Sequence, residues 1–516
     1  MDDYSTAIGT AMAERSDLAA KWLDDAMKRF PSEPKVLGLA ADIYAQKGDF
    51  ARAEMYYRSA LAVAGRKPKA DTAPLFAGRQ PGNALGRLIV GEQDQTPPAP
   101  EPGADRLGRV LSGDANADTL PGPFANSLVN QKSEGDRIAD RLQAITARNT
   151  PTFEVTSTIS SRSGTPGFDR RTLQETEIGV SKVLGNAVRA SLIVRPTAIR
   201  TEAADGTSET FRLGLLPVGA TFDGQSVSGM AAEFQLSSND FGLRVGASPQ
   251  GFLVKNYIGG LRFRPAGGHI TVLLNRDNVK DSLLSFAGQQ DPITKQTWGG
   301  VVANLAQVTG NWGDEKGGFY VSGGYSIVTG KNVQTNRAFH GNGGNYWRVL
   351  QNASGALTVG LNLTGMAYEK NLRYYTAGQG GYFSPQRFYM FNVPLTWRGT
   401  YGPRFRYVVN GGLGTQHFRE DRSPYFPTMA ALQNAVALYY PGQSQTGASY
   451  SVDFRGIYQL SEQWFLESYF NLNNARNFTA QSAGFTLKYG FRPRPIGTEP
   501  GPPSVPDWKG AQPFLP

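Results

Sequence analysis

The side chains that most often carry out chemistry are scarce in this chain of 516 residues. It contains no Cys and only three His, which are His269, His340 and His417. None of them lies in a recognisable nucleophile motif, and their spacing does not match that of zinc ligands. Paired carboxylates could cleave glycosides, but no segment presents such a pair at an obvious site. The sequence therefore predicts a binding protein rather than an enzyme, with no cofactor and no metal site.

Polar side chains alternate with apolar ones along many short segments, and this pattern could line a binding surface. Strands point successive side chains to opposite faces, so the pattern predicts one buried face and one wet face. Acids and bases are mixed on the wet face, and a wall whose groups pair only with one another is the alternative to a binding role. The candidate binding residues are Arg262, Arg404, Arg406, Asp453, Arg455, Glu467, Tyr469 and Asn471, together with Trp508 near the C-terminus.

The overall composition fits a membrane barrel better than an α/β enzyme. Mean hydropathy is −0.36 and the formal net charge is +9. Alternation keeps the mean hydropathy of a transmembrane barrel unremarkable, so a polar average does not exclude one. The basic residues are scattered along strand-like segments rather than clustered, and we therefore predict no nucleic-acid partner.

The lengths of the connections decide between a barrel and a soluble sandwich. When the expected strands, given below, are counted in chain order, the even-numbered ones end in tight turns. The odd-numbered ones mostly precede long loops such as 201–226, 277–296, 330–344 and 420–448. Short periplasmic turns and long extracellular loops are typical of outer-membrane barrels. We therefore predict an all-β, 16-stranded antiparallel transmembrane β-barrel over residues 151–492. The strands are expected near 152–162, 171–182, 187–199, 227–236, 240–247, 254–264, 268–276, 297–311, 316–329, 345–350, 355–369, 382–398, 404–419, 449–459, 464–473 and 479–491.

Three further zones flank or precede the barrel. Residues 1–64 are expected to be helical, near 3–13, 16–29, 33–46 and 50–64. Ala19 and Ala26 match Ala53 and Ala60 at a constant offset, which resembles the tetratricopeptide repeat, although any two helical hairpins would also fit. Residues 65–150 read as a Pro/Gly-rich linker with a short helix near 133–147, and residues 493–516 as a Pro-rich tail. The first residues have no signal-peptide pattern, so we expect further repeats before Met1.

Two local features of the barrel region are expected to matter for a pore. An apolar helix is predicted over 428–438, in the loop 420–448, and it could fold over the pore mouth as a lid. Tryptophans at strand ends, among them Trp298, Trp312, Trp397 and Trp464, are expected in interfacial belts.

One run of sequence resembles a known family. A motif over residues 380–386 follows Gly378 and Gln379 and precedes Asn392-Val393-Pro394-Leu395. With this motif, the sequence resembles the C-terminal region of cellulose synthase operon protein C. We interpret the motif as a Gly-rich strand entry without direct substrate contact. Its residues are Gly380, Gly381, Tyr382, Phe383, Ser384, Pro385 and Gln386.

The resemblance implies an outer-membrane channel for cellulose in a Gram-negative bacterium, with tetratricopeptide repeats in the periplasm. It implies partners as well: the translocated glucan, the inner-membrane synthase, periplasmic synthase components and outer-membrane lipid. Cellulose is uncharged, so Tyr and Trp would stack on its rings while Asn, Arg and acids exchange hydrogen bonds with its hydroxyls. Exporters of poly-N-acetylglucosamine or alginate are the alternative. Alginate would favour an intensely basic lumen, and the mixed acids and bases here favour a neutral polymer.

Overall fold

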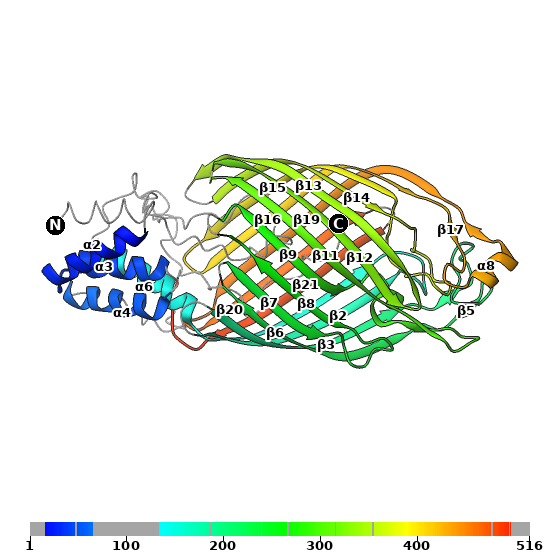
Figure 1. Ribbon diagram of the computed structural model, residues 1–516, viewed down its shortest axis with the longest axis horizontal. Helices are drawn as coiled ribbons and strands as arrows, with labels where there is room; N and C mark the ends of the chain where they lie inside the picture. Colours follow the sequence, from blue (N-terminus) through cyan, green and yellow to red (C-terminus); the bar gives the residue numbers. More distant parts are fainter. Residues whose placement is uncertain are drawn as a thin grey trace, which may run out of the picture.

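The computed structural model describes residues 16–46, 49–64, 134–184, 188–238, 240–265, 268–314, 316–352, 355–475, 478–494 and 496. These residues form a group of helices at one end of a long β-barrel, with irregular loops at the other end (Figure 1). We refer to the two ends as the helix end and the loop end. The helix expected near 3–13 lies outside the described residues. So do most of the expected linker and most of the expected tail, including Trp508.

Four helices make up the helical part. They are α2 (Ser16–Arg29), α3 (Pro34–Gln46), α4 (Phe50–Val63) and α6 (Glu134–Asn149). Asp49 caps α4 by accepting the backbone N–H of Arg52 at 3.1 Å. Ala53 and Ala60 are fully buried, because small side chains let neighbouring helices approach closely. Residues of α3, α4 and α6 share one apolar core, so α6 extends the bundle before the chain enters the barrel. The assignment to tetratricopeptide repeats stays a prediction.

The barrel is closed by sixteen antiparallel strands, as predicted. Each strand pairs with its predecessor and its successor, and the first and last pair with each other through Thr152↔Gly490. The strands are β1 (Thr152–Arg162), β2 (Arg171–Leu184), β3 (Val188–Thr201), β6 (Ser226–Ser237), β7 (Phe241–Ala247), β8 (Tyr257–Phe263), β9 (Ile270–Asn278), β11 (Thr297–Gly313), β12 (Gly317–Lys331), β13 (Val333–Asn352), β14 (Gly355–Tyr368), β15 (Arg387–Tyr401), β16 (Phe405–Glu420), β19 (Gln443–Gln459), β20 (Trp464–Ala475) and β21 (Phe478–Gly490). Shorter strands lie in the loops: β4 (Ala204–Asp205), β5 (Thr221–Phe222), β10 (Gln289–Gln290), β17 (Ser423–Pro424) and β18 (Tyr439–Tyr440).

The alternation of short and long connections holds for most of the barrel. Short turns lie at the helix end, and the loops 202–225, 279–296, 369–386 and 421–442 lie at the loop end. The prediction of a long loop over 330–344 is wrong. Those residues belong to β12 and to the twenty-residue strand β13, which are joined through Asn332 in a left-handed conformation (φ 52°). The Gly- and Asn-rich composition of this segment resembles a loop, but cross-strand pairing with β12 and β14 overrides that local preference.

The outward face of the barrel is apolar, and its inward face is polar. Large outward side chains are highly exposed, for example Leu413 at 67% and Phe339 at 68%. Aromatic pairs gather at the helix end, where Trp312 stacks on Phe319. Trp298 was expected in an interfacial belt, but it is buried in a hydrophobic cluster at the loop end of the barrel. No helix within the described ranges is both long and apolar enough to cross a membrane.

Candidate functional site

The lumen wall is the candidate functional site, because alternation points the polar side chains of the strands inward. Five of the predicted residues lie on the neighbouring strands β19 and β20. Arg455 pairs in register with Tyr469, and Asp453 pairs with Asn471. Glu467 is one step nearer the helix end on the same inward face. The structure therefore brings these five side chains together on one strip of wall. Their role in binding stays a prediction.

The remaining predicted arginines lie near the helix end. Arg404 donates to the carbonyl oxygens of Gln459 and Leu460 at 3.2 and 3.1 Å, so it braces the turn between β19 and β20. Arg262 donates to the carbonyl of Ser238 at 3.2 Å and supports another turn. Arg406 lies on β16 across from β19. Through these contacts, Arg404 and Arg262 stabilise turns at the helix end of the barrel.

One side of the lumen wall carries a continuous chain of ion pairs that sequence reasoning missed. Arg195 on β3 lies 2.9 Å from Glu177 on β2 and 3.7 Å from Glu233 on β6. Arg244 on β7 lies 3.7 Å from Glu233 and 2.7 Å from Asp277 on β9. We call these five residues and their strands the charged half. Opposite charges alternate along it, so each arginine lies between two acids.

The middle of the opposite side of the wall is rich in neutral amides and hydroxyls, whereas Arg348, Arg398 and Arg406 lie on the same inward faces nearer the helix end. Asn362 on β14 accepts from Tyr320 on β12 at 2.7 Å and from Asn342 on β13 at 2.8 Å. Asn362 also donates to Asn392 on β15 at 2.8 Å and to Thr364 at 3.2 Å. We call this ladder across β12–β16 the amide half. The alternation Leu357–Thr364 predicted the strand that carries Asn362, but the cross-strand ladder depends on register, which the sequence does not show.

The amide half continues toward β19. Thr396 on β15 donates to Asn410 on β16 at 2.9 Å, and Asn410 donates to Asp453 at 3.0 Å. Among the described residues, several inward polar atoms on this side have no hydrogen-bond partner. They include Oδ1 of Asn342 and Oγ of Ser322. Buried polar atoms of this kind usually bond ordered water.

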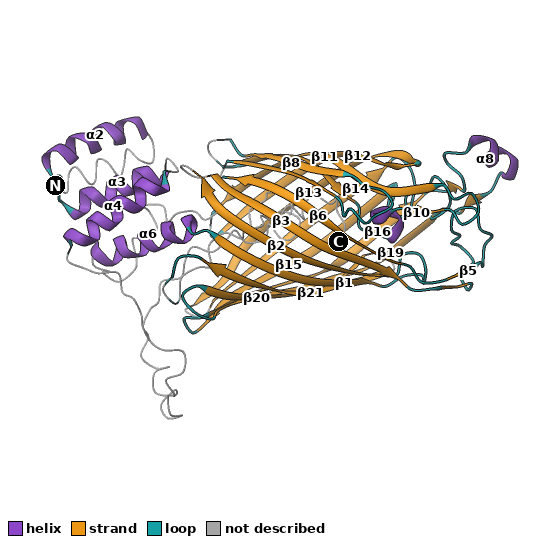
Figure 2. Cartoon of the chain, turned by 90° about the horizontal axis from the view of Figure 1, so that it is seen from below, coloured by secondary structure: helices purple, strands orange, loops and turns teal. Residues whose placement is uncertain are grey.

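The loop 279–296 folds into the barrel instead of standing outside it. It contains α7 (Leu283–Ala287), whose residues are all buried and which contacts both β3 and β11, five strands apart along the wall. Figure 2 shows this short helix within the outline of the barrel. Ser282 and Ser285 form a capping box at its start, and Phe286 packs on Phe252 with ring centroids 4.9 Å apart. The loop therefore occupies part of the lumen near the loop end.

The family motif forms part of this inward-folded structure. It is a buried loop, and β15 begins only at Arg387 rather than near residue 382 as expected. Gly381 has a φ of +66°, and a Cβ there would lie 2.7 Å from Oγ of Ser282. Ser282 donates to the carbonyl of Gly381 at 2.7 Å, and Ser384 accepts the N–H of Leu372 at 2.8 Å. The glycine is thus required by backbone conformation and by the close approach of α7.

Asp281 joins the motif to the barrel wall. Its Oδ2 accepts the backbone N–H of Phe383 at 2.9 Å and lies 3.7 Å from the guanidinium of Arg162 on β1. Arg162 and Arg171 both donate to the Asp281 carbonyl at 3.3 Å. Three segments far apart in the sequence therefore meet at one buried carboxylate.

Aromatic side chains from four loops close over the inward-folded loop. Phe168 packs on Phe211 and Tyr375, with centroids 5.4 and 5.2 Å apart. Tyr374 stacks on Tyr440 at 3.6 Å, and all five rings are buried. Burial of the phenol raises the pKa of Tyr374 to about 12, so it stays neutral. This cluster, rather than the expected lid, covers the loop end.

The helix expected over 428–438 is present as α8 (Ala430–Val436), but it does not pack as a lid. Figures 1 and 2 place α8 beyond the strand ends, at the loop end. Gln433 is its only buried residue, and nearby Leu438 is 47% exposed. Gln433 closes the loop on itself, since it accepts the N–H of Phe426 at 2.9 Å and donates to the carbonyl of Leu438 at 2.9 Å.

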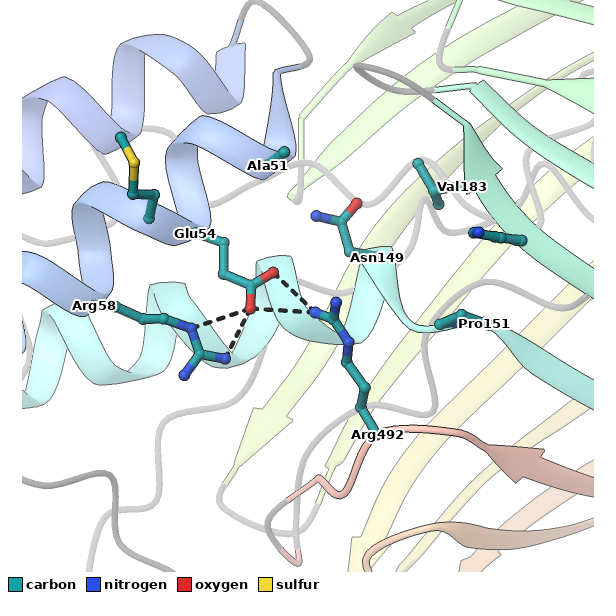
Figure 3. A pocket seen from close by; sticks show the side chains of 9 residues that line it. Ala51, Glu54, Arg58, Asn149, Pro151, Val183 and Arg492 are labelled. Carbon is teal, nitrogen blue, oxygen red and sulfur yellow. Dashed lines mark hydrogen bonds and ion pairs between the residues drawn. The ribbon is translucent and has the colours of Figure 1, made fainter.

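At the helix end, α4 meets the rim of the barrel across a cleft of about 490 Å³. Glu54 on α4 bonds Arg58 on its own helix at 2.7 Å and Arg492 after β21 at 3.1 Å (Figure 3). Asn149 and Pro151, where α6 passes into β1, line the same cleft. The helices are thus fastened to the barrel by a covalent connection and by one ion-pair cluster.

No group of three or more His, Asp or Glu side chains within the described ranges is arranged to hold a metal ion. The closed barrel, its apolar outer face and its polar inner face define an outer-membrane-type β-barrel.

The chain belongs to the family described as cellulose synthase operon protein C C-terminus, whose model matches residues 169–492. It is 29% identical over 517 residues to a cellulose synthase operon protein C of Pseudomonas fluorescens, covering 94% of this chain and 39% of that protein. It is 35% identical over 280 residues to one of Komagataeibacter xylinus, covering 51% of this chain and 21% of that protein. The chain thus spans well under half the length of these relatives.

Among solved structures, a bacterial polysaccharide outer membrane secretin is similar, with a TM-score of 0.43 and 9% identity. The similarity covers 67% of this chain and 99% of that chain. Pseudomonas putida OprB is also similar, with a TM-score of 0.34 and 10% identity, covering 71% of this chain and 99% of that chain.

Proposed function

We propose that this protein is an outer-membrane channel that exports a neutral polysaccharide, cellulose, from the periplasm to the exterior, and that it is not an enzyme. The observation that carries the proposal is the chemistry of the lumen wall. The acids and arginines of the charged half pair with one another, and the amide half offers uncharged hydrogen-bonding groups. Family membership supports the choice of polymer.

A neutral glucan fits this wall for a physical reason. Its hydroxyl groups both donate and accept hydrogen bonds, as amides do, and it brings no charge into the barrel. Unpaired acceptors such as Oδ1 of Asn342 would bond passing hydroxyls weakly and interchangeably. A polyanion would instead compete with Glu177, Glu233 and Asp277 for the arginines, which would hold it back rather than let it pass.

We also propose that the helices at the other end deliver the polymer to the lumen and couple the channel to the synthase. They lie at the mouth of the barrel (Figure 2). The Glu54–Arg492 pair and the passage from α6 into β1 keep them there. In this arrangement the helix end faces the periplasm, and the loop end faces outward.

Polymer block of single-channel current tests the proposed function. The full chain is inserted into planar bilayers, and cello-oligosaccharides are added on the helix side. We expect them to interrupt the current more strongly than alginate oligosaccharides of equal length. Stronger block by the alginate fragments would assign the channel to an acidic polymer, and equal block would contradict a preference for a neutral glucan.

A further inference from the structure

Basic side chains gather on the outward face of four neighbouring strands at the loop end. Arg337 lies near the start of β13, Lys370 follows β14, Arg387 begins β15, and Arg419 is near the end of β16. We call these four residues the basic edge cluster. The outward orientation of the arginines follows from the strand pattern, because Phe339 is two residues along from Arg337 and is 68% exposed. Lys370 lies beyond the end of its strand, and its Nζ donates to the carbonyl of Thr335 at 2.9 Å. The side chains of Arg337 and Arg419 are 58% and 52% exposed.

The cluster has more bases than acids. Glu369 lies 3.5 Å from Arg337 and 3.7 Å from Lys370. Asp421 lies 3.0 Å from Arg419. Within the described part of the chain, Arg387 has no acidic partner. Four bases therefore face two acids, and the surplus positive charge is centred on Arg387.

Register places two of these arginines against each other. Arg387 on β15 and Arg419 on β16 are direct cross-strand partners. Side chains in such a position have Cβ atoms about 4.5–5.5 Å apart, and like charges there destabilise the pairing. A phosphate group seated between the two guanidinium groups would remove the repulsion and accept charge-assisted hydrogen bonds from both. The register thus places two guanidinium-bearing side chains next to each other at one level of the wall, and only that of Arg419 is shared with an acid, Asp421.

The surface next to the cluster, toward the helix end, is apolar. Tyr389 and Phe391 follow Arg387 on the outward face of β15 and are 55% and 46% exposed. Leu363 pairs with Phe391 and is 57% exposed, and Leu413 on β16 is 67% exposed. A ligand that fits both surfaces carries a phosphorylated head at the edge of the membrane and acyl chains along the strands.

The same level of the wall elsewhere does not carry this charge. The outward residues at the loop end of β19, β21 and β2 are neutral, for example Ser444, Gln481 and Gln174. Other bases at this level lie singly: Arg200 on β3 faces Thr172 and Ser226 in register, Arg276 on β9 faces Asn304 and Gly259, and Lys331 at the end of β12 faces Gly299. Lys255 is exposed and lies before β8, outside the strand pairings. Among the outward faces of the described strands, the cross-strand pair of bases is therefore confined to β15 and β16.

We propose that the basic edge cluster binds one phosphorylated lipid of the outer leaflet. Its phosphate lies between Arg387 and Arg419, and its acyl chains lie on Phe391, Leu363 and Leu413. The site needs only that the loop end faces outward, and it does not depend on which polymer passes through the lumen.

Native mass spectrometry of the full chain in detergent tests the proposal, with bis-phosphorylated lipid A as the probe. The variant R387Q/R419Q is compared with R200Q/K255Q, which removes equal charge at the same edge. We expect the cluster variant to lose retention of lipid A about a hundredfold, because it removes one charge-assisted hydrogen bond from each arginine and each is worth about a factor of ten. The control should bind like the wild type. The single variant R387Q keeps the Arg419–Asp421 pair and should weaken retention of lipid A less than the double variant does. It still tests the proposal if the double variant fails to fold.

Four outcomes would overturn the proposal. The first is equal retention of lipid A by R387Q/R419Q and by the wild type. The second is equal binding of a lipid A that lacks both phosphates, which would assign the contact to apolar surface alone. The third is complete displacement of lipid A by inorganic phosphate, which would assign the seat to a free anion. Preference for phosphatidylglycerol over lipid A would also contradict an outer-leaflet site.

Discussion

The two halves of the lumen wall use the same strand geometry for different chemistry. In the charged half, Arg195 and Arg244 each lie between two acids. In the amide half, Asn362 alone joins four neighbouring side chains on β12–β15, and none of them carries a charge. A paired charge depends on its partner, whereas a neutral amide can exchange one hydrogen bond for another with little change in energy.

The two halves of the wall are therefore expected to have different roles. The side chains of the charged half are fixed in position, because moving any one of them would leave a charge unpaired. The amide half can release its lateral bonds to hydroxyl groups and reform them after the polymer has moved. We therefore expect substitutions in the charged half to affect stability and ion selectivity, and substitutions in the amide half to affect polymer passage.

The largest effect is expected from Arg244→Met in the charged half. The substitution removes the arginine that lies 2.7 Å from Asp277, while Glu233 keeps only Arg195 at 3.7 Å. Breaking a buried ion pair on one side costs about 3–5 kcal/mol, and the surplus negative charge should make the pore prefer cations. Denaturant unfolding in detergent and the reversal potential in a salt gradient measure the two effects. An unchanged reversal potential would show that the charged half does not face the conducting path.

A smaller loss of stability is expected from Asn362→Leu in the amide half. It removes the centre of the ladder and leaves Tyr320 and Asn392 with unpaired groups, at a cost of about 1–3 kcal/mol. Block by cello-oligosaccharides should weaken about tenfold, the loss of one hydrogen bond in a confined site, whereas ion selectivity should not change. Asn362→Gln keeps the amide and is the control. Equal polymer block in the leucine variant would remove the amide half from the polymer path.

The loops anchored beside the charged half should respond to acid. Burial alone would raise the pKa of Asp291. The backbone N–H groups of Thr294, Leu215 and Ile293 donate to its carboxylate, and the net result is a lowered pKa. A lowered pKa means that this contact is fully present above the ordinary aspartate pKa of about 3.9 and is lost as pH falls through the value in the folded protein.

Channel conductance against pH measures this response. We expect it to stay constant from neutral pH down to about 4 and to rise below that, as the loops 202–225 and 279–296 separate. Asp291→Asn should weaken the same contact at every pH. A wild-type conductance that rises already between pH 7 and 5 would assign the change to another group.

The smallest effect is expected outside the lumen, from Glu54→Gln at the helix end. The side chains of Arg58 and Arg492 are half-exposed, and ion pairs of this kind contribute at most about 1 kcal/mol. Conductance and polymer block should match the wild type, while the helices should become easier to cleave from the barrel by limited proteolysis. A change in ion selectivity would show that this pair influences the lumen after all.

Local patterns predicted the strands better than they predicted the contents of the lumen. Alternation and connection length were enough for sixteen strands, because a barrel repeats one rule along the whole chain. The strand β13 was cut short because Gly341, Gly343 and Gly344 look like a loop when cross-strand pairing is ignored. The apolar run Leu283–Ala287 was a usable signal for an inward-folded loop, since such residues would not face water outside the cell.

The lumen ladders could not be predicted in the same way. Arg244 and Asp277 are far apart in the sequence, and they meet across the intervening strand β8, on which Gly260 is in register with Arg244 and with Asn275. The register of three strands has to be known before such a contact can be stated. The candidate residues were therefore assigned to the correct kind of surface, but their partners were not.

The most direct test of the central claim is to locate a polymer inside the barrel. A cello-oligosaccharide that carries a photoreactive group is trapped in the lumen of the full chain, and cross-linked peptides are identified by mass spectrometry. We expect cross-links to inward positions of β12–β16, near Asn342, Asn362 and Asn392, and few to β2–β9. Cross-links spread evenly over both halves, or concentrated near Arg195 and Arg244, would contradict it.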